Sequence, residues 1–364
     1  MKRQIFLFIL IVISFRAACQ EATLLFFGDI MGHGAQIESA ERDEGRYYDY
    51  SENFKYIEPY FRSADVVVGN LEVTLAGKPY KGYPLFSSPD ELATALKESG
   101  VNVLVTANNH SCDRGRAGLE RTIKVLDQHH FVRTGTFLDS TDMAKHHPRI
   151  IHINGIKLAL LNYTYGTNGI PVTQPNIVNL IDKETMKQDL KLTKSMHPDK
   201  IIMFLHWGNE YATSPSNDQT ELAEFLFEHG ADIIIGAHPH VIQPMHLTYQ
   251  NDREQLVVYS LGNFISNQRW ELTDGGAMVR ITLAKHKGDT YIKDAQHLLT
   301  WVHTPIIDNR RRYYIYPASV WDRQGVPDHI APGWEGMKQY LKSAREVMQL
   351  NTYIREATEE WPLK

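Results

Sequence analysis

Cysteine is scarce in this sequence: the 364 residues include two, Cys19 and Cys112. Cys19 lies in an N-terminal segment that we expect to be removed, so the mature chain would keep Cys112 alone and could form no internal disulfide. The remaining residues 20–364 are numerous enough to bury a large apolar core. The sequence therefore predicts that packing, rather than cross-links, stabilises the fold, with Cys112 as a small buried side chain.

Positive charge is also in short supply, with 38 Lys and Arg against 43 Asp and Glu and a formal net charge of −5. Loss of residues 1–19, which hold three basic residues and no acidic one, would make the net charge −8. The cluster Arg310–Arg312 is interpreted as a solvated turn. This balance argues against nucleic acid as a partner, and weighs slightly against direct binding of a polyanion without a bridging metal.

The apolar run from Ile5 to Phe15 is too short to anchor the chain as a bilayer-spanning helix, which takes about 20 residues. Two basic residues precede it, and the small residues Ala17 and Ala18 and then Cys19 follow, the layout of a cleaved secretory signal. We expect residues 1–19 to be a signal peptide and the protein to be exported to the periplasm or cell surface. Cys19 could instead be lipidated and tie the chain to a membrane, but Arg16 stands where such signals carry an aliphatic residue, which favours simple release.

Short apolar runs alternate with helical segments along the rest of the chain, the pattern of an α/β protein. Most of the runs lack polar alternation, as expected for strands covered on both faces. The predicted strands are 23–27, 65–68, 101–105, 157–162, 200–205, 232–235 and 255–260, and the predicted helices are 88–99, 115–129, 182–196 and 218–229. Residues 149–162 read as a hairpin around Asn154-Gly155. Residues 20–275 are predicted to form the core, and strands at 277–283 and 290–301 and a helix at 334–350 to complete the same domain from within 276–364.

The segment Gly236-Ala-His-Pro-His240 directly follows the apolar run 232–235. Side chains alternate along an extended backbone, so His238 and His240 face the same way and form a ready pair of metal ligands. Two polar loop residues are the alternative interpretation of this segment taken alone. However, other predicted strands also end in candidate ligands or polar groups: Asp29, His33, Asn70, Glu72, Asn109, His110, Asp113, His206, Glu210 and Asn263.

Ligands bind beyond the carboxyl ends of parallel strands, where these residues are expected to meet. Buried carboxylates and imidazoles need either mutual pairing or a cation to offset the cost of desolvation. A set of two carboxylates, an amide oxygen and three histidines fits a divalent metal site better than a salt-bridge cluster. The metal could be Mn, Fe, Zn or Mg, which the sequence does not distinguish.

Six motifs resemble the CapA family of poly-γ-glutamate capsule synthesis, a branch of the calcineurin-like metallophosphoesterases: GDIMGHG, GNLE, NNHSCDRGRAGL, HWGNEY, GAHPHV and YSLGNF. They run from residue 28 to residue 264. The resemblance implies an α/β/β/α sandwich, here with a C-terminal extension, and a dinuclear metal centre at the strand ends.

The resemblance also implies roles for individual residues. One metal would be bound by Asp29 and His240, the other by Asn109, His206 and His238, with Glu72 as the bridge. His110 would be the proton donor, and Asp113 would either orient His110 or cap the following helix. The chain departs from the superfamily pattern in two places, because His33 lies four residues beyond Asp29 rather than two, and because Glu72 stands where an Asp is usual.

Candidate substrate contacts complete the predicted site: His33, Asn70, Trp207, Glu210 and Asn263. Trp207 has an alternative interpretation as core or pocket wall, and Trp270 is treated as background. The first functional hypothesis is a metal-dependent hydrolase of a phosphoester or amide-like bond. The second is a non-catalytic envelope component that holds or helps export an anionic polymer such as poly-γ-glutamate, together with other capsule-synthesis proteins.

Overall fold

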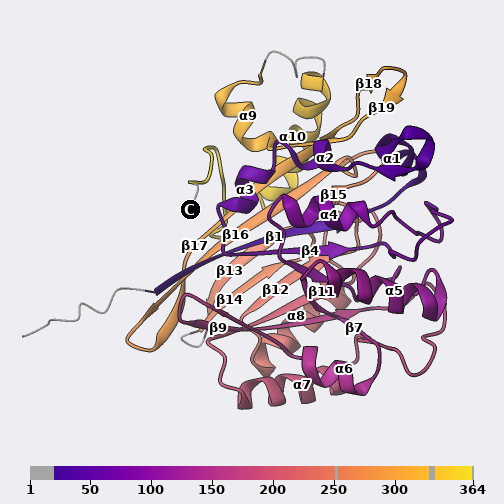
Figure 1. The fold of residues 1–364 in the computed structure, drawn as a ribbon. Coiled ribbons are helices and arrows are strands. Elements are labelled where there is room, and N and C mark those ends of the chain that lie inside the picture. Colours follow the sequence, from indigo (N-terminus) through magenta and orange to yellow (C-terminus); the bar gives the residue numbers. More distant parts are fainter. Residues whose placement is uncertain (1–19, 251–252, 328–332, 363–364) are drawn as a thin grey trace, which may run out of the picture.

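Two β-sheets pack face to face and are covered by helices in this computed structural model, which describes residues 20–250, 253–327 and 333–362 (Figure 1). The predicted signal peptide, residues 1–19, lies outside the described residues. Among the described residues, no helix is both long and apolar enough to cross a membrane. The α/β/β/α sandwich expected from the sequence is confirmed.

The first sheet is mixed: β1 continues through parallel strands on one side and pairs with a long antiparallel strand on the other. Its order is β20 (Tyr314–Tyr316), β17 (Asp289–His303), β16 (Gly275–His286), β1 (Gln20–Ile30), β4 (Val66–Leu71), β5 (Val103–Val105) and β6 (Val132–Thr134). In addition, β15 (Asn263–Ile265) pairs with the end of β1, and β21 (Arg355–Glu356) pairs with β17.

The second sheet has the parallel strands β9, β11, β12 and β14 at its centre. Its order is β13 (Met245–Gln250), β14 (Arg253–Val258), β12 (Ile233–Ala237), β11 (Lys200–His206), β9 (Ile156–Thr164) and β8 (Arg149–Ile153). The predicted hairpin is present, since β8 and β9 pair around Asn154 and Gly155, both of which have the positive φ that such a tight turn requires. Short two-stranded ribbons form at the surface: β2 (Glu41–Arg42) with β3 (Tyr47–Tyr48), β7 (Thr136–Phe137) with β10 (Ile177–Val178), and β18 (Ile306–Ile307) with β19 (Arg310–Arg311).

Alternate residues of each strand build the two faces of the second sheet. In β11, Ile202 and Phe204 belong to the core shared with the first sheet, whereas Met203 and Leu205 pack outward. That outer face is covered by α7 (Lys183–Ser195) and α8 (Asn217–His229), at the foot of the molecule in Figure 1. The apolar faces of these helices thus explain why the strands lack polar alternation.

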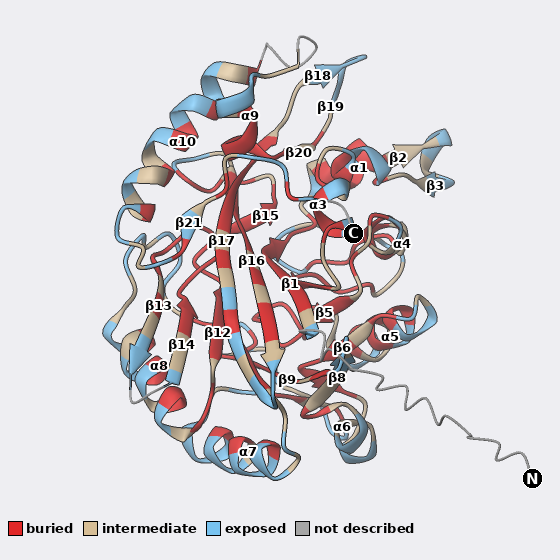
Figure 2. Cartoon of the chain, turned by 90° about the vertical axis from the view of Figure 1, so that its left-hand side faces the viewer, coloured by how far each residue is buried: buried red, intermediate tan, exposed pale blue. Residues whose placement is uncertain are grey.

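Other helices cover the first sheet. They are α2 (Ser51–Phe54), α3 (Glu58–Arg62), α4 (Glu91–Glu98) and α5 (Gly115–Gln128), whose buried side chains belong to the same core cluster as β1 and β4 or to a small cluster beside β5. α1 (Gly34–Ala40) follows β1, and α6 (Ser140–His146) follows β7. Near the C-terminus, α9 (Ala318–Gln324) and α10 (Trp334–Met348) lie along β17, at the upper left of Figure 2.

The helix predicted from Ser88 begins later, at Glu91. Ser88 does not cap it, because the backbone N–H of Ser88 donates to Thr74 O and its side chain packs against Gly32. Asp90 occupies the capping position instead, without a side-chain capping bond. Tertiary packing of the preceding loop therefore overrides the local capping signal.

The strands predicted at 277–283 and 290–301 join the first sheet rather than a separate one. β16 pairs antiparallel with β1 from Gln20↔Lys285 to Phe27↔Met278, and β17 continues the sheet. Both strands are longer than predicted. They close the side of β1 that faces away from β4.

Phe27 tests how far the aromatic packing under α3 stabilises the fold. Its ring lies 5.1 Å from that of Phe61 and 4.3 Å from that of Phe264, and it is fully buried. We expect Phe27→Ala to lower the free energy of unfolding by about 3–5 kcal/mol, because it leaves a cavity. Urea unfolding is the measurement. Tyr249→Ala, at a position 63% exposed, is the control and is expected to stay within about 0.5 kcal/mol of wild type.

Candidate metal centre

The carboxyl ends of strands from both sheets meet at one edge of the sandwich. Asp29 lies near the end of β1, and Glu72 directly follows the parallel strand β4. His206 ends β11, and His238 directly follows the parallel strand β12. The order of strands in the two sheets therefore brings together groups that lie far apart in the sequence.

All six predicted ligands converge, as the sequence predicts. His240 Nδ1 lies 3.3 Å from Asp29 Oδ2, and His206 Nε2 lies 3.5 Å from Glu72 Oε1. Asn109 Oδ1 lies 2.9 Å from His206 Nε2. Two groups have candidate ligand atoms within 4.8 Å of one another: Glu72, His238 and His240, and Asp29, Glu72 and His206.

Glu72 is the shared member of these two groups, as expected of a bridging ligand. The division of the other ligands differs from the predicted one, because His206 groups with Asp29 and His238 groups with His240. The rings of His206 and His238 are nevertheless only 4.8 Å apart. The assignment of each ligand to one of two ions stays a prediction.

The Glu72 carboxylate is the group that most needs a cation. It is fully buried, and neither oxygen has a hydrogen-bond partner among the described residues. Burial, followed by the nearby Asp29 charge, raises the pKa of Glu72 well above its usual range. A divalent ion would supply the missing partner, so the residues present fit a metal.

Burial favours the neutral form of two of the histidines, His206 and His238, and this is the form that binds metal. Burial lowers the pKa of His206 well below its usual range and lowers that of His238 to about 3. His238 Nδ1 is buried and has no hydrogen-bond partner among the described residues. Burial also acts to raise the pKa of Asp29, but its contacts with His240, Asn70 and the His238 N–H outweigh burial and hold that pKa below its usual value. The site thus offers neutral imidazoles and an ionised carboxylate, which are the forms that bind cations.

The backbone is strained in the segment that holds two of the histidines. His238 has a φ of 102° and His240 a φ of 58°, a region that non-glycine residues seldom occupy. Such residues cost on the order of 1–3 kcal/mol each and cluster at functional sites. The surrounding fold holds both rings against this cost.

His110 and Asp113 form a buried pair beside the predicted ligands. His110 Nδ1 lies 2.7 Å from Asp113 Oδ2, and the same oxygen accepts a hydrogen bond from Phe86 N at 2.7 Å. The Phe86 ring packs against the His110 ring at 4.6 Å. Of the two roles considered for Asp113, the contacts show it orienting His110, whereas α5 begins at Gly115 with no side-chain cap.

The chain matches the sequence profile of a family described as "Bacterial capsule synthesis protein PGA_cap" over residues 23–268. It belongs to this family. It is 31% identical over 277 residues to the "Capsule biosynthesis protein CapA" of Bacillus anthracis, covering 72% of this chain and 64% of that protein. It is also 31% identical over 275 residues to the "PGA biosynthesis protein CapA" of Bacillus subtilis, covering 72% and 67% respectively. The match thus spans about two thirds of the length of these relatives.

The fold is that of the calcineurin-like phosphoesterases. The calcineurin-like phosphoesterase YfkN of Bacillus subtilis superposes with a TM-score of 0.50 at 14% identity, covering 89% of this chain and 99% of that one. At that identity the likeness establishes the fold alone. Together with the family match, it confirms the family and fold expected from the sequence motifs.

Asn70 and Asn263 are predicted from the sequence to contact substrate. In the structure their side chains contact the predicted metal ligands. Asn70 Nδ2 donates to Asp29 Oδ1 at 2.7 Å and lies 3.2 Å from His206 Nδ1. Asn263 Oδ1 lies 3.1 Å from His240 Nδ1, and Asn263 Nδ2 donates to Gln268 and Thr273. Both asparagines are fully buried, so their contacts are within the protein.

Asn108 belongs to the same support and was not singled out in the sequence. Its Nδ2 donates to Leu71 O at 2.7 Å and reaches Asn70 Oδ1 at 3.2 Å. Its Oδ1 accepts from the backbone N–H of His110 at 3.1 Å. One amide side chain therefore ties the ends of β4 and β5 to the His110 loop, a role that adjacency to Asn109 alone could not reveal.

The remaining substrate candidates have different surroundings. Trp207 is buried, donates to Tyr259 O at 2.9 Å and packs with the outer core under α8, as the core alternative proposed. His33 is half-buried at the start of α1, where its Nδ1 accepts from Asn267 N at 3.3 Å. Burial lowers the pKa of His33 to about 4. Glu210 is exposed, and its charge contributes to the raised pKa of Glu72.

Aromatic residues beside the ligands were missed in the sequence. Tyr165 directly follows β9, and its ring lies 4.6 Å from that of His238. Tyr211 lies 6.1 Å from His240 and 5.4 Å from Trp270, ring to ring. Inspection of every strand end, without restriction to ligand types, would have found Tyr165. Cys112, by contrast, is buried as expected, and burial raises the pKa of its thiol to about 11.

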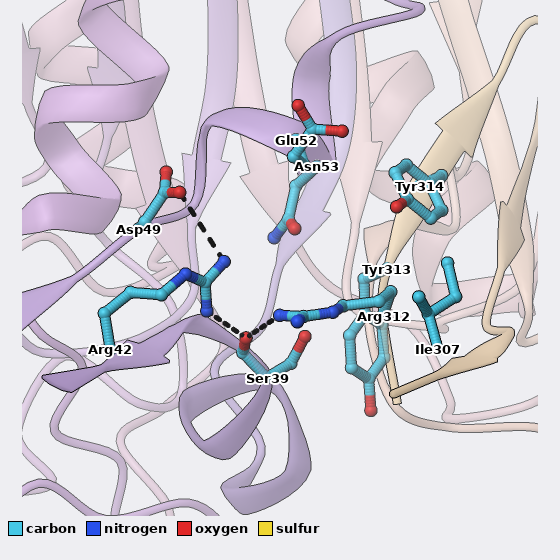
Figure 3. A pocket seen from close by; sticks show the side chains of 9 residues that line it. All are labelled: Ser39, Arg42, Asp49, Glu52, Asn53, Ile307, Arg312, Tyr313 and Tyr314. Atoms are coloured by element: carbon cyan, nitrogen blue, oxygen red, sulfur yellow. Dashed lines mark hydrogen bonds and ion pairs between the residues drawn. The ribbon is translucent and has the colours of Figure 1, made fainter. Parts of the chain in front are cut away.

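A hollow of about 240 Å³ lies away from the ligand cluster, between α1 and the β18–β19 ribbon (Figure 3). Its arginines already have partners, because Arg42 and Arg312 both donate to Ser39 O and Arg42 also pairs with Asp49 at 3.5 Å. None of the predicted metal ligands lines this hollow. The strand-end cluster therefore remains the candidate functional site.

Substitution of Glu72 by glutamine tests the burial of an unpartnered carboxylate. In the unfolded chain the group titrates near 4.5, whereas in the metal-free folded chain its pKa is raised. Above about pH 4.5 Glu72 loses its proton in the unfolded chain but keeps it in the folded chain, so the folded wild-type protein becomes less stable as pH rises, until the folded pKa is passed. We expect metal-free Glu72→Gln to be as stable as wild type near about pH 4.5 and more stable than wild type at about pH 8, measured by urea unfolding.

The control for this prediction is Glu221→Gln, at an exposed position on α8. It should show no gain over wild type as pH rises. A metal-free Glu72→Gln protein that is less stable than wild type at about pH 8 would contradict the proposed environment of Glu72.

Proposed function

We propose that this protein is an exported, metal-dependent hydrolase of cell-envelope or capsule synthesis, which cleaves a phosphoester or amide-like bond. The observation that carries the proposal is the buried Glu72 carboxylate, which has no hydrogen-bond partner among the described residues and lies beside Asp29, His206, His238 and His240. Membership of a capsule-synthesis family and the calcineurin-like fold support it. The names of the CapA relatives refer to capsule and PGA synthesis, and this assigns the process rather than the reaction.

The residues that would hold the metal are the six converging side chains: Asp29, Glu72, Asn109, His206, His238 and His240. Bound divalent ions supply positive charge that stabilises an anionic transition state and lowers the pKa of water. Asn70 and Asn263 keep Asp29, His206 and His240 in position through the contacts described above.

His110 serves as the general acid. Because Asp113 and Phe86 fix the Nδ1 side of the ring, Nε2 is the nitrogen that remains to hold a proton and deliver it to a leaving group. A site that only captured a cation would have no need of this pair, which favours the hydrolase over the non-catalytic alternative.

Replacement of His110 separates catalysis from metal binding. We expect His110→Gln to retain its metal and to lower kcat by about 10²–10⁴-fold, the usual contribution of general acid–base catalysis. The assay covers phosphomonoester, phosphodiester and γ-glutamyl substrates with Mn, Zn, Fe and Mg. His130→Gln, at an exposed position after α5, is the matched control and should leave kcat unchanged.

Glu72→Ala and His238→Ala should lose the bound metal, measured by elemental analysis of the purified proteins. Full metal occupancy in both variants would remove the basis for the proposal. Wild-type protein that holds metal but turns over none of these substrates, while binding poly-γ-glutamate tightly, would favour the non-catalytic alternative.

Export rests on residues 1–19 and is tested by cell fractionation. We expect the mature protein to begin after this segment and to be released into the periplasm or to the cell surface. Cys19→Ala should leave that distribution unchanged, because Arg16 is unsuited to a lipidation signal. Retention of wild-type protein in membranes, with release of the Cys19→Ala variant, would instead identify a lipid anchor.

A further inference from the structure

Four exposed aromatic side chains gather around the candidate metal centre: Tyr83, Tyr165, Tyr211 and Trp270, here called the aromatic rim. Their exposed fractions are 72%, 48%, 43% and 51% in that order. Tyr165 and Tyr211 pack beside the rings of His238 and His240, respectively. Single exposed aromatic residues are ordinary, but several beside one cluster of polar side chains indicate a binding surface.

The rim residues contact one another or the proposed catalytic group. Tyr211 packs against Trp270, and Gln268 lies within 3.4 Å of the Tyr211 hydroxyl. Tyr83 packs on Phe86, which in turn packs on His110. A substrate that reaches both the ligands and His110 would therefore lie against these rings.

The backbone holds the rim residues in place before any ligand arrives. Tyr165 N donates to His206 O at 3.0 Å, and Tyr211 N donates to Pro239 O at 2.8 Å. Tyr211 has a φ of 66°, a strained conformation for an aromatic residue. Trp270 sits in a turn closed by Thr273, whose hydroxyl contacts both the N–H and the carbonyl of Trp270. Exposed rings held in this way lose little conformational entropy when a ligand binds.

The charges near the rim are unfavourable for a polyanion. Glu210 directly precedes Tyr211 in the chain and is exposed. The Tyr211 hydroxyl also lies 3.4 Å from the side chain of Gln268, so the rim offers polar groups beside its rings. This surface suits hydroxyl groups better than a row of carboxylates.

The arrangement of the rings distinguishes between flat and puckered ligands. The rings of Tyr211 and Trp270 meet at an interplanar angle of 69°. Because the rings are not parallel, a flat ligand cannot stack on both of them at once. A planar base is held best between parallel rings. A pyranose instead offers an apolar face of C–H groups to one ring and its hydroxyls to the polar groups around it.

We propose that the aromatic rim is a subsite for a pyranose ring of a neutral glycan, and that the bond to be cleaved lies next to this sugar. The identification of the sugar as part of the substrate rests on the proposed hydrolase function, whereas binding of the sugar does not. The substrate class would then be a glycan carrying a phosphoester or amide-like linkage, rather than a bare anionic polymer.

Binding measurements on the metal-loaded full-length mature protein test the subsite without relying on turnover. The probes are oligosaccharides of N-acetylglucosamine, glucose and mannose, with poly-γ-glutamate and adenosine for comparison. Binding is measured by calorimetry and by tryptophan fluorescence. We expect at least one of the oligosaccharides to bind, and Tyr211→Ala and Trp270→Ala to weaken that binding by roughly tenfold or more. Trp270→Phe should retain part of the affinity, because a ring remains.

Tyr291→Ala is the matched control, since Tyr291 is also 43% exposed but lies on β17. It should bind the oligosaccharide as wild type does. The proposal is overturned if no oligosaccharide binds, if the rim variants bind like the control, or if adenosine or poly-γ-glutamate alone binds in a rim-dependent manner.

The same measurements separate this proposal from the hydrolase. His110→Gln should bind the oligosaccharide as tightly as wild type. Rim-dependent binding by a protein that is inactive on every substrate would leave the subsite standing and refute the hydrolase. Turnover of simple phosphoesters without any sugar binding would do the reverse.

Discussion

Desolvation of Glu72 is the constraint on which the rest of the site depends. Two carboxylates, Asp29 and Glu72, are fully buried a few ångströms apart, and burial lowers the pKa of the His206 and His238 imidazoles beside them. Asp29 is stabilised by an amide, a backbone N–H and His240, whereas Glu72 has no such partner among the described residues. A fold that gathers these groups leaves one negative charge uncompensated, and a cation is the compensation that the donor set suits.

The support around the ligands explains how this arrangement survives its own cost. Asn70, Asn108 and Asn263 join neighbouring strand ends through side-chain hydrogen bonds, and Asn263 also contacts the ring of His240, whose backbone is strained. Asp29, His206 and His240 are therefore each fixed by a second residue. The same rigidity extends to the aromatic rim through Tyr165 and Tyr211, whose backbone N–H groups bond to residues of the ligand loops.

The sequence revealed the ligands because their chemistry is unusual at strand ends. Apolar strands followed by Asp, Glu, Asn or His need a reason, and six motifs in family order predict both the family and the candidate site. The supporting residues could not be found in the same way. Asn70 could as well have faced a substrate, and only its contacts with Asp29 and His206 decide that it does not.

Local signals also failed where packing decided the outcome. Ser88 looked like a helix cap, but its backbone bonds to Thr74. Trp270 looked like background, because its position next to Tyr211 depends on a turn that brings together residues far apart in the chain. Trp207 lies in the motif HWGNEY but points into the outer core. Adjacency in sequence therefore did not imply adjacency in the site.

The pairing of β1 has a consequence for when the centre can exist. Asp29 in β1 pairs with Asn263 in β15, and Gln20 at the start of β1 pairs with Lys285 in β16. More than two hundred residues of chain separate the partners in each pair. Contacts of such long sequence separation form late in folding. A nascent or still-unfolded chain therefore has no preformed cage for an ion, and the compartment in which the polypeptide completes its fold decides which metal it meets first.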